Sequence, residues 1–319
     1  MNRLTADTLH GIWAGVTLAW DDAGAFDEAA YSENTRALCD AGVHGIYTTG
    51  STGEFYALSF EEFKRMVDIQ CDLCGAQGMP LQIGCCSDNT SATLRLLEYA
   101  AGKPAVGAAQ VALPYWMELT DRELLQFFKD LHSACPALPL VHYNIPRAKR
   151  FLHGSDYLRI LEVAPSLIGV KYTFAGSHFA ELQESLLLTP RLAYFVAENL
   201  LASAMLLGAR GSCSSLVCTD PAYMLTFYDH AVNARWEKAS AMQQTIQRFF
   251  TEIMPFVAAR GEGMIDPVFD KGLAKAAGFL AGSQRTRAPY IGWSDATVMA
   301  VREWLRAKYP MFLHPACRT

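Results

Sequence analysis

Residues 156–188 read DYLRILEVAPSLIGVKYTFAGSHFAELQESLLL. Two segments of this stretch, Asp156–Ala164 and His178–Leu188, carry apolar residues at three- and four-residue spacing and flank a short apolar run, Ile168–Tyr172. The spacing predicts two amphipathic helices, and an apolar run of this length between them predicts a buried strand. The stretch therefore indicates a helix–strand–helix unit of an α/β fold.

The same alternation repeats along most of the chain. We predict strands at Gly15–Ala19, Gly45–Thr49, Leu81–Cys85, Ala109–Leu113, Leu138–Tyr143, Ile168–Tyr172, Ala193–Ala197 and Gly211–Ser215. The helices predicted between them are Phe26–Ala41, Ser59–Cys74, Thr90–Ala101, Thr120–Cys135, Asp156–Ala164, His178–Leu188 and Leu200–Leu207. Eight such units predict a TIM (β/α)8 barrel. An open doubly wound sheet is the alternative, which the missing glycine-rich dinucleotide motif disfavours.

After Pro221 the strand signal stops. The remaining sequence predicts only helices, at Pro221–Ala231, Ala234–Phe256, Asp266–Phe279 and Ser294–Lys308. We therefore expect the barrel to occupy residues 1–230, and residues 231–319 to form a C-terminal helical extension packed on it. A chain of 319 residues has the right length for this arrangement.

Composition excludes several classes of function. The net charge is −5 with no basic stripe, which argues against nucleic acid as a partner. The first ten residues lack the apolar core of a signal peptide, and the most apolar stretch, Leu200–Ala209, is too short to span a membrane. Nine scattered cysteines, an odd number, predict free and mostly buried thiols in a reducing compartment. We expect a cytoplasmic protein.

The cysteine pattern does not predict a metal site. Cys71 and Cys74 form a C-x-x-C pair within a predicted helix, and Cys85 and Cys86 lie nearby. A zinc site would need a second well-spaced pair or histidines. Structural or incidental cysteines are the interpretation that we adopt.

Lys171 is the sharpest candidate for a catalytic residue, because the chemistry of such barrels occurs at the C-terminal ends of the strands. It ends a predicted apolar strand, which would place its amine inside the barrel mouth. A buried lysine without a carboxylate neighbour is costly unless its pKa falls, and a lowered pKa yields the free amine of an imine-forming nucleophile. A lysine that reaches solvent, or one paired with Glu198, fits its position equally well.

Two further strand ends carry polar groups. Gly50-Ser51-Thr52-Gly53 combines glycines that allow a tight turn with two hydroxyl donors, a pattern that suits a small anion. Alone it also fits an ordinary turn with a capping hydroxyl. Tyr143 ends another strand and carries a phenol that can exchange a proton with a ligand, although most core tyrosines serve packing. Their common placement with Lys171 favours a single site.

These residues resemble a known family. Gly50-Ser51-Thr52-Gly53-Glu54, Tyr143-Asn144-x-Pro146 and Gly169-Val170-Lys171 are similar in order and spacing to motifs of the dihydrodipicolinate synthase/N-acetylneuraminate lyase family, and the likeness runs from about Gly11 to Ser215. It implies a (β/α)8 barrel of the class I aldolases, in which pyruvate forms a Schiff base with the lysine. It also implies no metal, no organic cofactor, and a homotetramer built as a dimer of dimers.

The resemblance also assigns roles to residues. Lys171, Tyr143 and Thr52 would be catalytic, with Tyr143 passing protons to and from the substrate oxygen. Ser51 and Thr52 would hold the pyruvate carboxylate, assisted by the backbone of Gly50 and Gly53. The second substrate would be an aldehyde.

Two departures argue against a true dihydrodipicolinate synthase. Ala148 stands where that branch carries an arginine for the second substrate's carboxylate, with Arg147 and Lys149 on either side. Trp116 replaces a tyrosine that relays protons in that branch, and an indole has no hydroxyl to do so. We therefore expect a divergent member of the family.

Other residues point to different second substrates. Thr173 and Glu198 are similar to groups that meet the hydroxylated chain in sugar-acid lyases, whereas Trp116 and Cys213 favour a less polar pocket. The leading hypothesis is an aldolase or lyase for a 2-oxo-3-deoxy sugar acid or a 4-hydroxy-2-oxo acid. The alternatives are a hydratase-aldolase for aromatic or bulky aldehydes, a sugar-acid dehydratase with the same lysine imine, and a non-catalytic protein that binds 2-oxo acids.

Overall fold

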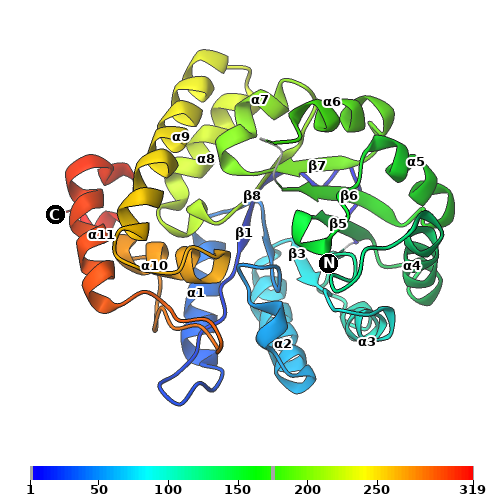
Figure 1. Cartoon of the computed structure of the whole chain (residues 1–319), viewed down its shortest axis with the longest axis horizontal. Coiled ribbons are helices and arrows are strands. Elements are labelled where there is room, and N and C mark those ends of the chain that lie inside the picture. Colours follow the sequence, from blue (N-terminus) through cyan, green and yellow to red (C-terminus); the bar gives the residue numbers. More distant parts are fainter. Residues whose placement is uncertain (1–2, 174–176, 319) are drawn as a thin grey trace.

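Eight parallel strands form a closed barrel in the computed structural model, which describes residues 3–173 and 177–318. Each strand pairs with the next along the chain, and β8 pairs with β1 to close the sheet. Helices surround the strands (Figure 1). The TIM barrel predicted from the alternation of strands and helices is confirmed.

The strands are short, and each overlaps a predicted one. They are β1 Gly11–Gly15, β2 Gly45–Tyr47, β3 Leu81–Gly84, β4 Ala108–Val111, β5 Leu140–Asn144, β6 Leu167–Tyr172, β7 Ala193–Val196 and β8 Gly211–Ser214. Only β1 differs clearly, since it begins four residues before the predicted Gly15. The apolar residues Val16 and Leu18, on which that prediction rested, are buried in the core after the strand has ended.

The helices follow the predicted positions closely. The barrel helices are α1 Glu28–Asp40, α2 Phe60–Gln77, α3 Thr90–Ala101, α4 Asp121–Ala134, α5 Gly154–Val163, α6 Phe179–Leu188, α7 Leu201–Met205 and α8 Pro221–Val232. Capping boxes begin α2 at Ser59 and α4 at Thr120, as the sequence signals there indicate. One-turn 3-10 helices follow four strands at Phe55–Ala57, Pro146–Ala148, Glu198–Leu200 and Leu216–Cys218.

Three further helices, α9 Trp236–Ala258, α10 Asp266–Ala277 and α11 Asp295–Lys308, form the C-terminal part of the chain. They gather at one side of the barrel in Figure 1. α9 packs on α7 and α8, whereas α10 packs on α11 and on the 3-10 turn after β8. This last contact brings α10 to the end of the barrel where the strands terminate.

The barrel interior is filled by side chains. Trp13, Tyr47, Val141 and Phe195 point inward from four strands and form one apolar cluster with leucines of the N-terminal segment. The backbone of that segment bonds to Gly107, just before β4, so it covers the N-terminal end of the barrel. The C-terminal ends of the strands remain as the place for a site. No helix of the described residues is long and apolar enough to cross a membrane.

Candidate active site

Lys171 and Tyr143 face each other inside the barrel mouth. They are register partners on the adjacent strands β6 and β5, so both side chains point inward at the same level. The Lys171 amine lies 4.1 Å from the centre of the Tyr143 ring and 4.5 Å from the centre of the Tyr47 ring. It donates a hydrogen bond of 3.4 Å to the Tyr47 hydroxyl, and the residue is 6% exposed. The amine is therefore held between two phenol rings.

The protonation of Lys171 depends on its uncharged neighbours. Burial, the largest influence, lowers the pKa of the amine, whereas ionised Tyr143, Tyr47 and Cys213 would raise it above its ordinary value. Burial raises the pKa of all three of those groups, that of Cys213 to about 12, so they are neutral near pH 7. Burial then lowers the pKa of the amine and the hydrogen bond to the Tyr47 hydroxyl raises it; burial is the larger of these two influences and favours the unprotonated nucleophile.

The expected alternative partner of the lysine is engaged elsewhere. Glu198 accepts hydrogen bonds from the Ser214 hydroxyl at 3.1 Å and from the backbone N–H of Leu216 at 3.0 Å. Within residues 3–173 and 177–318, no carboxylate forms an ion pair with Lys171. Glu198 therefore supports the turn after β8, and the amine keeps no counter-ion in the described site.

The turn after β2 passes directly beside the amine. A Cβ atom added at Gly50 would lie 3.7 Å from the Lys171 Nζ, and one added at Gly53 would lie 2.6 Å from the backbone nitrogen of Thr49. Glycine is thus needed at Gly53, whereas Gly50 leaves only van der Waals distance between the turn and the amine. Thr49 itself has a φ of 47°, a strained value for a β-branched residue. Strain of this kind gathers at functional sites.

The two hydroxyls of this turn have different partners. Ser51 Oγ lies 3.1 Å from the Tyr143 hydroxyl and accepts a 3.2 Å hydrogen bond from Arg147. Because a guanidinium can only donate, the Ser51 hydrogen stays available to Tyr143. Thr52 donates a 2.7 Å hydrogen bond to the Asp270 carboxylate on α10. The turn therefore connects the barrel mouth to the C-terminal helices.

Burial and the neighbouring charge of Asp266 raise the pKa of Asp270 to about 8. Asp266 lies one helical turn before Asp270 on α10 and forms an ion pair of 2.6 Å with Arg147. Both carboxylates face the barrel mouth. Asp270 contacts Thr52 directly, and Asp266 holds the guanidinium of Arg147, which contacts Ser51.

Glu54 anchors the end of the same turn. It is fully buried and forms an ion pair with Lys271, the residue after Asp270 on α10. It also accepts hydrogen bonds of 3.1 Å and 3.2 Å from the Trp20 indole and one of 3.1 Å from the backbone N–H of Arg287. Glu54 is thus a structural residue that fixes α10 against the turn.

The other predicted binding residues lie at different distances from the amine. Cys213 points inward from β8, near enough to Lys171 to raise the pKa of the amine if its thiol were ionised. The Thr173 hydroxyl donates its hydrogen to the backbone carbonyl of Asn144 at 2.7 Å, so that hydrogen is used within the protein. Ala148 is buried and lines a cavity, whereas Trp116 is 75% exposed and lines neither cavity at the mouth.

An open cavity of about 340 Å³ lies above Tyr143. Its walls are mainly apolar and aromatic, with Arg147 and Asp266 as its charged members. They are Ser51, Phe55, Tyr56, Ala112, Leu113, Tyr115, Tyr143, Ile145, Arg147, Ala148, Ile265, Asp266, Pro267, Pro289 and Tyr290. Such a cavity suits a ligand with one polar end and a bulky apolar end.

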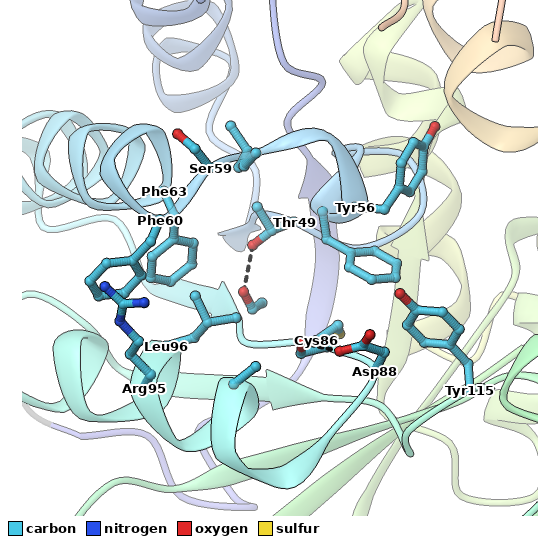
Figure 2. A pocket seen from close by; sticks show the side chains of 15 residues that line it. Thr49, Tyr56, Ser59, Phe60, Phe63, Cys86, Asp88, Arg95, Leu96 and Tyr115 are labelled. Carbon is cyan, nitrogen blue, oxygen red and sulfur yellow. Dashed lines mark hydrogen bonds between the residues drawn. The ribbon is translucent and has the colours of Figure 1, made fainter. Parts of the chain in front are cut away.

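A second cavity of about 240 Å³ lies on the other side of the turn after β2. It shares the rings of Phe55, Tyr56 and Tyr115 with the first, so these three rings separate the two spaces. Figure 2 shows Asp88 beside Tyr115 at one end, and at the other end an arginine stacked on Phe60.

Five residues of the site were not predicted from the sequence. Tyr47 and Gln110 lie on strands, and their inward position is a consequence of two-residue alternation. A glutamine within the apolar run of β4 is a signal that could have been used. Arg147 was noted only as a neighbour of Ala148. The four-residue spacing of Asp266 and Asp270 predicts a shared helix face, but nothing local indicates what that face contacts.

Neither metal ligands nor disulfides occur in the part of the chain that the structure describes. No group of three or more histidine, cysteine or acidic side chains is placed to hold a metal ion. All nine cysteines are free thiols, and six are buried. The prediction of free and mostly buried thiols is confirmed.

Fold and site together define a TIM barrel with a lysine and a tyrosine at the ends of adjacent strands. The chain belongs to the dihydrodipicolinate synthetase family, whose model matches residues 8–264 and whose members are class I lyases. It is 25% identical over 253 residues to a 4-hydroxy-tetrahydrodipicolinate synthase of Methanothrix thermoacetophila, which covers 77% of this chain and 83% of that one. The family predicted from the three motifs is confirmed.

Solved structures show the same fold at lower identity. Dihydrodipicolinate synthase from Aquifex aeolicus superposes with a TM-score of 0.84 at 19% identity, over 96% of this chain and 99% of that one. The E. coli K12 prophage protein YagE, solved in complex with pyruvate, gives a TM-score of 0.82 at 21% identity, over 94% of this chain and 98% of that one.

Proposed function

We propose that this protein is a class I aldolase or lyase that makes or cleaves a carbon–carbon bond between pyruvate and an aldehyde. The observation that carries the proposal is the buried Lys171 amine facing Tyr143 across two paired strands, without a counter-ion in the described site. An uncharged amine of this kind is the nucleophile that imine formation requires. The pyruvate bound to the related fold of YagE supports the choice of 2-oxo acid.

The residues of the mouth suit each step of such a reaction. The Lys171 amine adds to the keto carbon of pyruvate, and the carbinolamine loses water to give the imine. Net transfer of a methyl proton to the imine nitrogen gives the enamine. Its carbon attacks the aldehyde carbon, the nitrogen gives up that proton as the imine reforms, and the aldehyde oxygen takes up a proton. Tyr143, bonded to Ser51, is placed to give and accept that proton. Water then hydrolyses the imine and releases the product.

We further propose that the aldehyde is aromatic or bulky and apolar. The cavity above Tyr143 is walled mainly by rings and aliphatic side chains. The two groups expected to bind hydroxyls, Thr173 and Glu198, already hydrogen-bond to protein atoms. A hydroxylated chain would lose its bonds to water in this cavity with few replacements, which costs binding free energy.

A sugar-acid substrate is the second candidate. The Arg147–Asp266 pair lines the cavity and offers donors and an acceptor at one place. That pair could meet one or two hydroxyls of a short chain. It does not serve a long hydroxylated chain, because the remaining walls are apolar.

Reductive trapping tests the central step. The protein is incubated with pyruvate and borohydride, and the modified peptide is mapped by mass spectrometry. We expect one adduct, on Lys171, and none in Lys171→Ala. An adduct on another residue, or no adduct at saturating pyruvate, would overturn the proposal.

A substrate panel tests the choice of aldehyde. Pyruvate release is measured from 4-hydroxy-2-oxo acids with aryl substituents and from 2-oxo-3-deoxy sugar acids of matched length. The cavity predicts a higher kcat/KM for the aryl series. A preference for the sugar acids would assign the Arg147–Asp266 pair to hydroxyl recognition instead.

A further inference from the structure

Helix α10 presents two carboxylates to the two hydroxyls of the turn after β2. Asp270 accepts the Thr52 hydrogen directly, at 2.7 Å. Asp266 holds Arg147 at 2.6 Å, and Arg147 donates to Ser51 at 3.2 Å. In the proposed function we take these two hydroxyls to bind the carboxylate of pyruvate, the role that the family resemblance implies for them. An acidic side chain within hydrogen-bond distance of a carboxylate-binding hydroxyl therefore needs a chemical explanation.

Thr52 can donate only one hydrogen bond, and this limits how it can bind a substrate carboxylate. A threonine hydroxyl carries one hydrogen, and an ionised Asp270 carboxylate can only accept it. The hydroxyl then has lone pairs but no hydrogen to offer an incoming carboxylate. If Asp270 is protonated instead, its own hydrogen can bond to Thr52 Oγ, and the Thr52 hydrogen becomes available to the substrate. The protonated acid also removes repulsion between two negative charges.

We propose that Asp270 is a positioning residue that must carry a proton before Thr52 can bind the carboxylate of the 2-oxo acid. Binding of the substrate then takes up one proton when Asp270 is ionised in the free protein. The inference rests on the proposed function, since it takes Thr52 as a ligand of the substrate carboxylate.

The surroundings of Asp270 favour the protonated acid. Burial is the largest cause of its raised pKa, and the negative charges of Asp266 on α10 and Glu198 after β7 raise it further. The hydroxyls of Thr52 and Ser215 act in the opposite direction. The result is a pKa of about 8.

The remaining titratable groups around Asp270 do not neutralise it. Tyr47 of β2 and Cys218, in the 3-10 turn after β8, both have a raised pKa and are uncharged near pH 7. The neighbouring cations have other partners among the described residues, because Lys271 pairs with Glu54 and Arg147 pairs with Asp266.

The proton on Asp270 makes the affinity for pyruvate depend on pH in a definite direction. Below about pH 8 Asp270 already holds its proton, and pyruvate binds without proton uptake. Above that pH the proton must be taken from solution, so affinity falls by about tenfold for each further pH unit. Formation of the Lys171 imine by itself has the opposite trend over any pH range in which part of the amine is still protonated, because a higher pH yields more free amine.

Asp270→Asn separates the two trends. Its amide N–H can donate to Thr52 Oγ at any pH and cannot titrate. The pyruvate concentration that gives half-maximal borohydride-trapped adduct is measured from pH 6.5 to 9.5 in both proteins. We expect this half-maximal concentration in the wild type, divided by its value in Asp270→Asn, to be constant below pH 7.5. Above about pH 8.5 the ratio should rise about tenfold per pH unit.

Asp266→Asn is the matched control on the same helix. It removes the charge that raises the pKa of Asp270 without touching Thr52. In this variant the affinity for pyruvate should still decline as the pH rises, but the midpoint of the decline should move to lower pH. This shift also tests the inference if Asp270→Asn does not fold. A second measurement on the wild type is proton uptake on mixing with pyruvate in weak buffer, expected to be larger at pH 9 than at pH 6.5.

The outcomes are distinguishable. Parallel pH profiles of wild type and Asp270→Asn, or a proton uptake equal at the two pH values, would overturn the role of Asp270 while leaving the imine intact. No adduct at any pH in the wild type would overturn the proposed function and this inference with it.

Discussion

Glu54, at the end of the turn after β2, and Lys271, on α10, form an ion pair in which both side chains are fully buried. The pair is completed by the Trp20 indole and by a backbone N–H donor of Arg287. Burying two charges is expensive, and their attraction roughly offsets that cost only while both are present. The pair therefore fixes the position of α10 more than it adds to stability.

Loss of one member of this pair should destabilise the protein strongly. We expect Lys271→Met to lower the free energy of unfolding by about 3–5 kcal/mol, because Glu54 is left as a buried unpaired charge. Lys275→Met, one turn further along α10, is the control: Lys275 is half-buried and donates only to the Gly282 carbonyl, so this change should lower the free energy of unfolding by about 1 kcal/mol or less. Urea denaturation measures both, and equal effects would refute this account of the pair.

Lys171→Met should raise stability while abolishing activity. The amine is buried without a counter-ion in the described site, and methionine fills a similar volume without an amine to desolvate. We expect a higher midpoint of thermal unfolding, by a free energy of about 1 kcal/mol or more, and no borohydride-trapped adduct. A lower midpoint would show that the amine makes a net favourable contribution to the fold.

Tyr143→Phe should slow the carbon–carbon step more than imine formation. The substitution removes the hydroxyl that lies 3.1 Å from Ser51 Oγ and that we propose as the proton donor, and such groups contribute about a hundredfold or more. Single-turnover measurements separate trapped adduct from product. Tyr172→Phe is the control, because the buried Tyr172 hydroxyl has no hydrogen-bond partner in the described structure. If both variants were equally slow, the effect would come from packing.

Gln110 is buried beside the turn, and within the described structure its amide has no hydrogen-bond partner. Gln110→Leu should stabilise the fold by about 1–3 kcal/mol, since an unsatisfied buried polar group is removed. It should also weaken pyruvate binding, because the amide nitrogen lies close to Gly50. Gln82→Leu, which removes another unsatisfied amide oxygen from β3, should stabilise without changing that affinity. Unchanged pyruvate affinity in Gln110→Leu would leave the glutamine a purely structural residue.

The homotetramer implied by the family resemblance remains a prediction. Trp116 and Met117 are 75% and 71% exposed next to each other, which is unusual for large apolar side chains of a monomer. If they lie at a contact between copies, Trp116→Glu should reduce the mass measured by light scattering. Ile291→Glu, at an exposed residue elsewhere on the chain, is the control. An unchanged mass in Trp116→Glu would remove Trp116 from the interface.

The fold was predictable because its signal is local. Apolar periodicity located all eight strands to within a few residues, and the error at β1 arose where buried residues such as Val16 continue past the strand. The placement of Lys171 and Tyr143 side by side at the barrel mouth was predictable, because both residues lie at strand ends. The connections of the site to α10 were not predictable, because Thr52 and Asp270 lie 218 residues apart and nothing in either segment specifies the other.

The long separation of Glu54 from Lys271, 217 residues, has a consequence for the order of synthesis. A growing chain exposes the β2 turn, then Tyr143 and Lys171, well before α10 leaves the ribosome. Until α10 docks, Glu54 has no cation to meet, and the turn beside the amine is not held. If the proposed function holds, a nascent barrel carries its nucleophile without a finished carboxylate site, and the chain becomes competent only when its last quarter has folded onto the first.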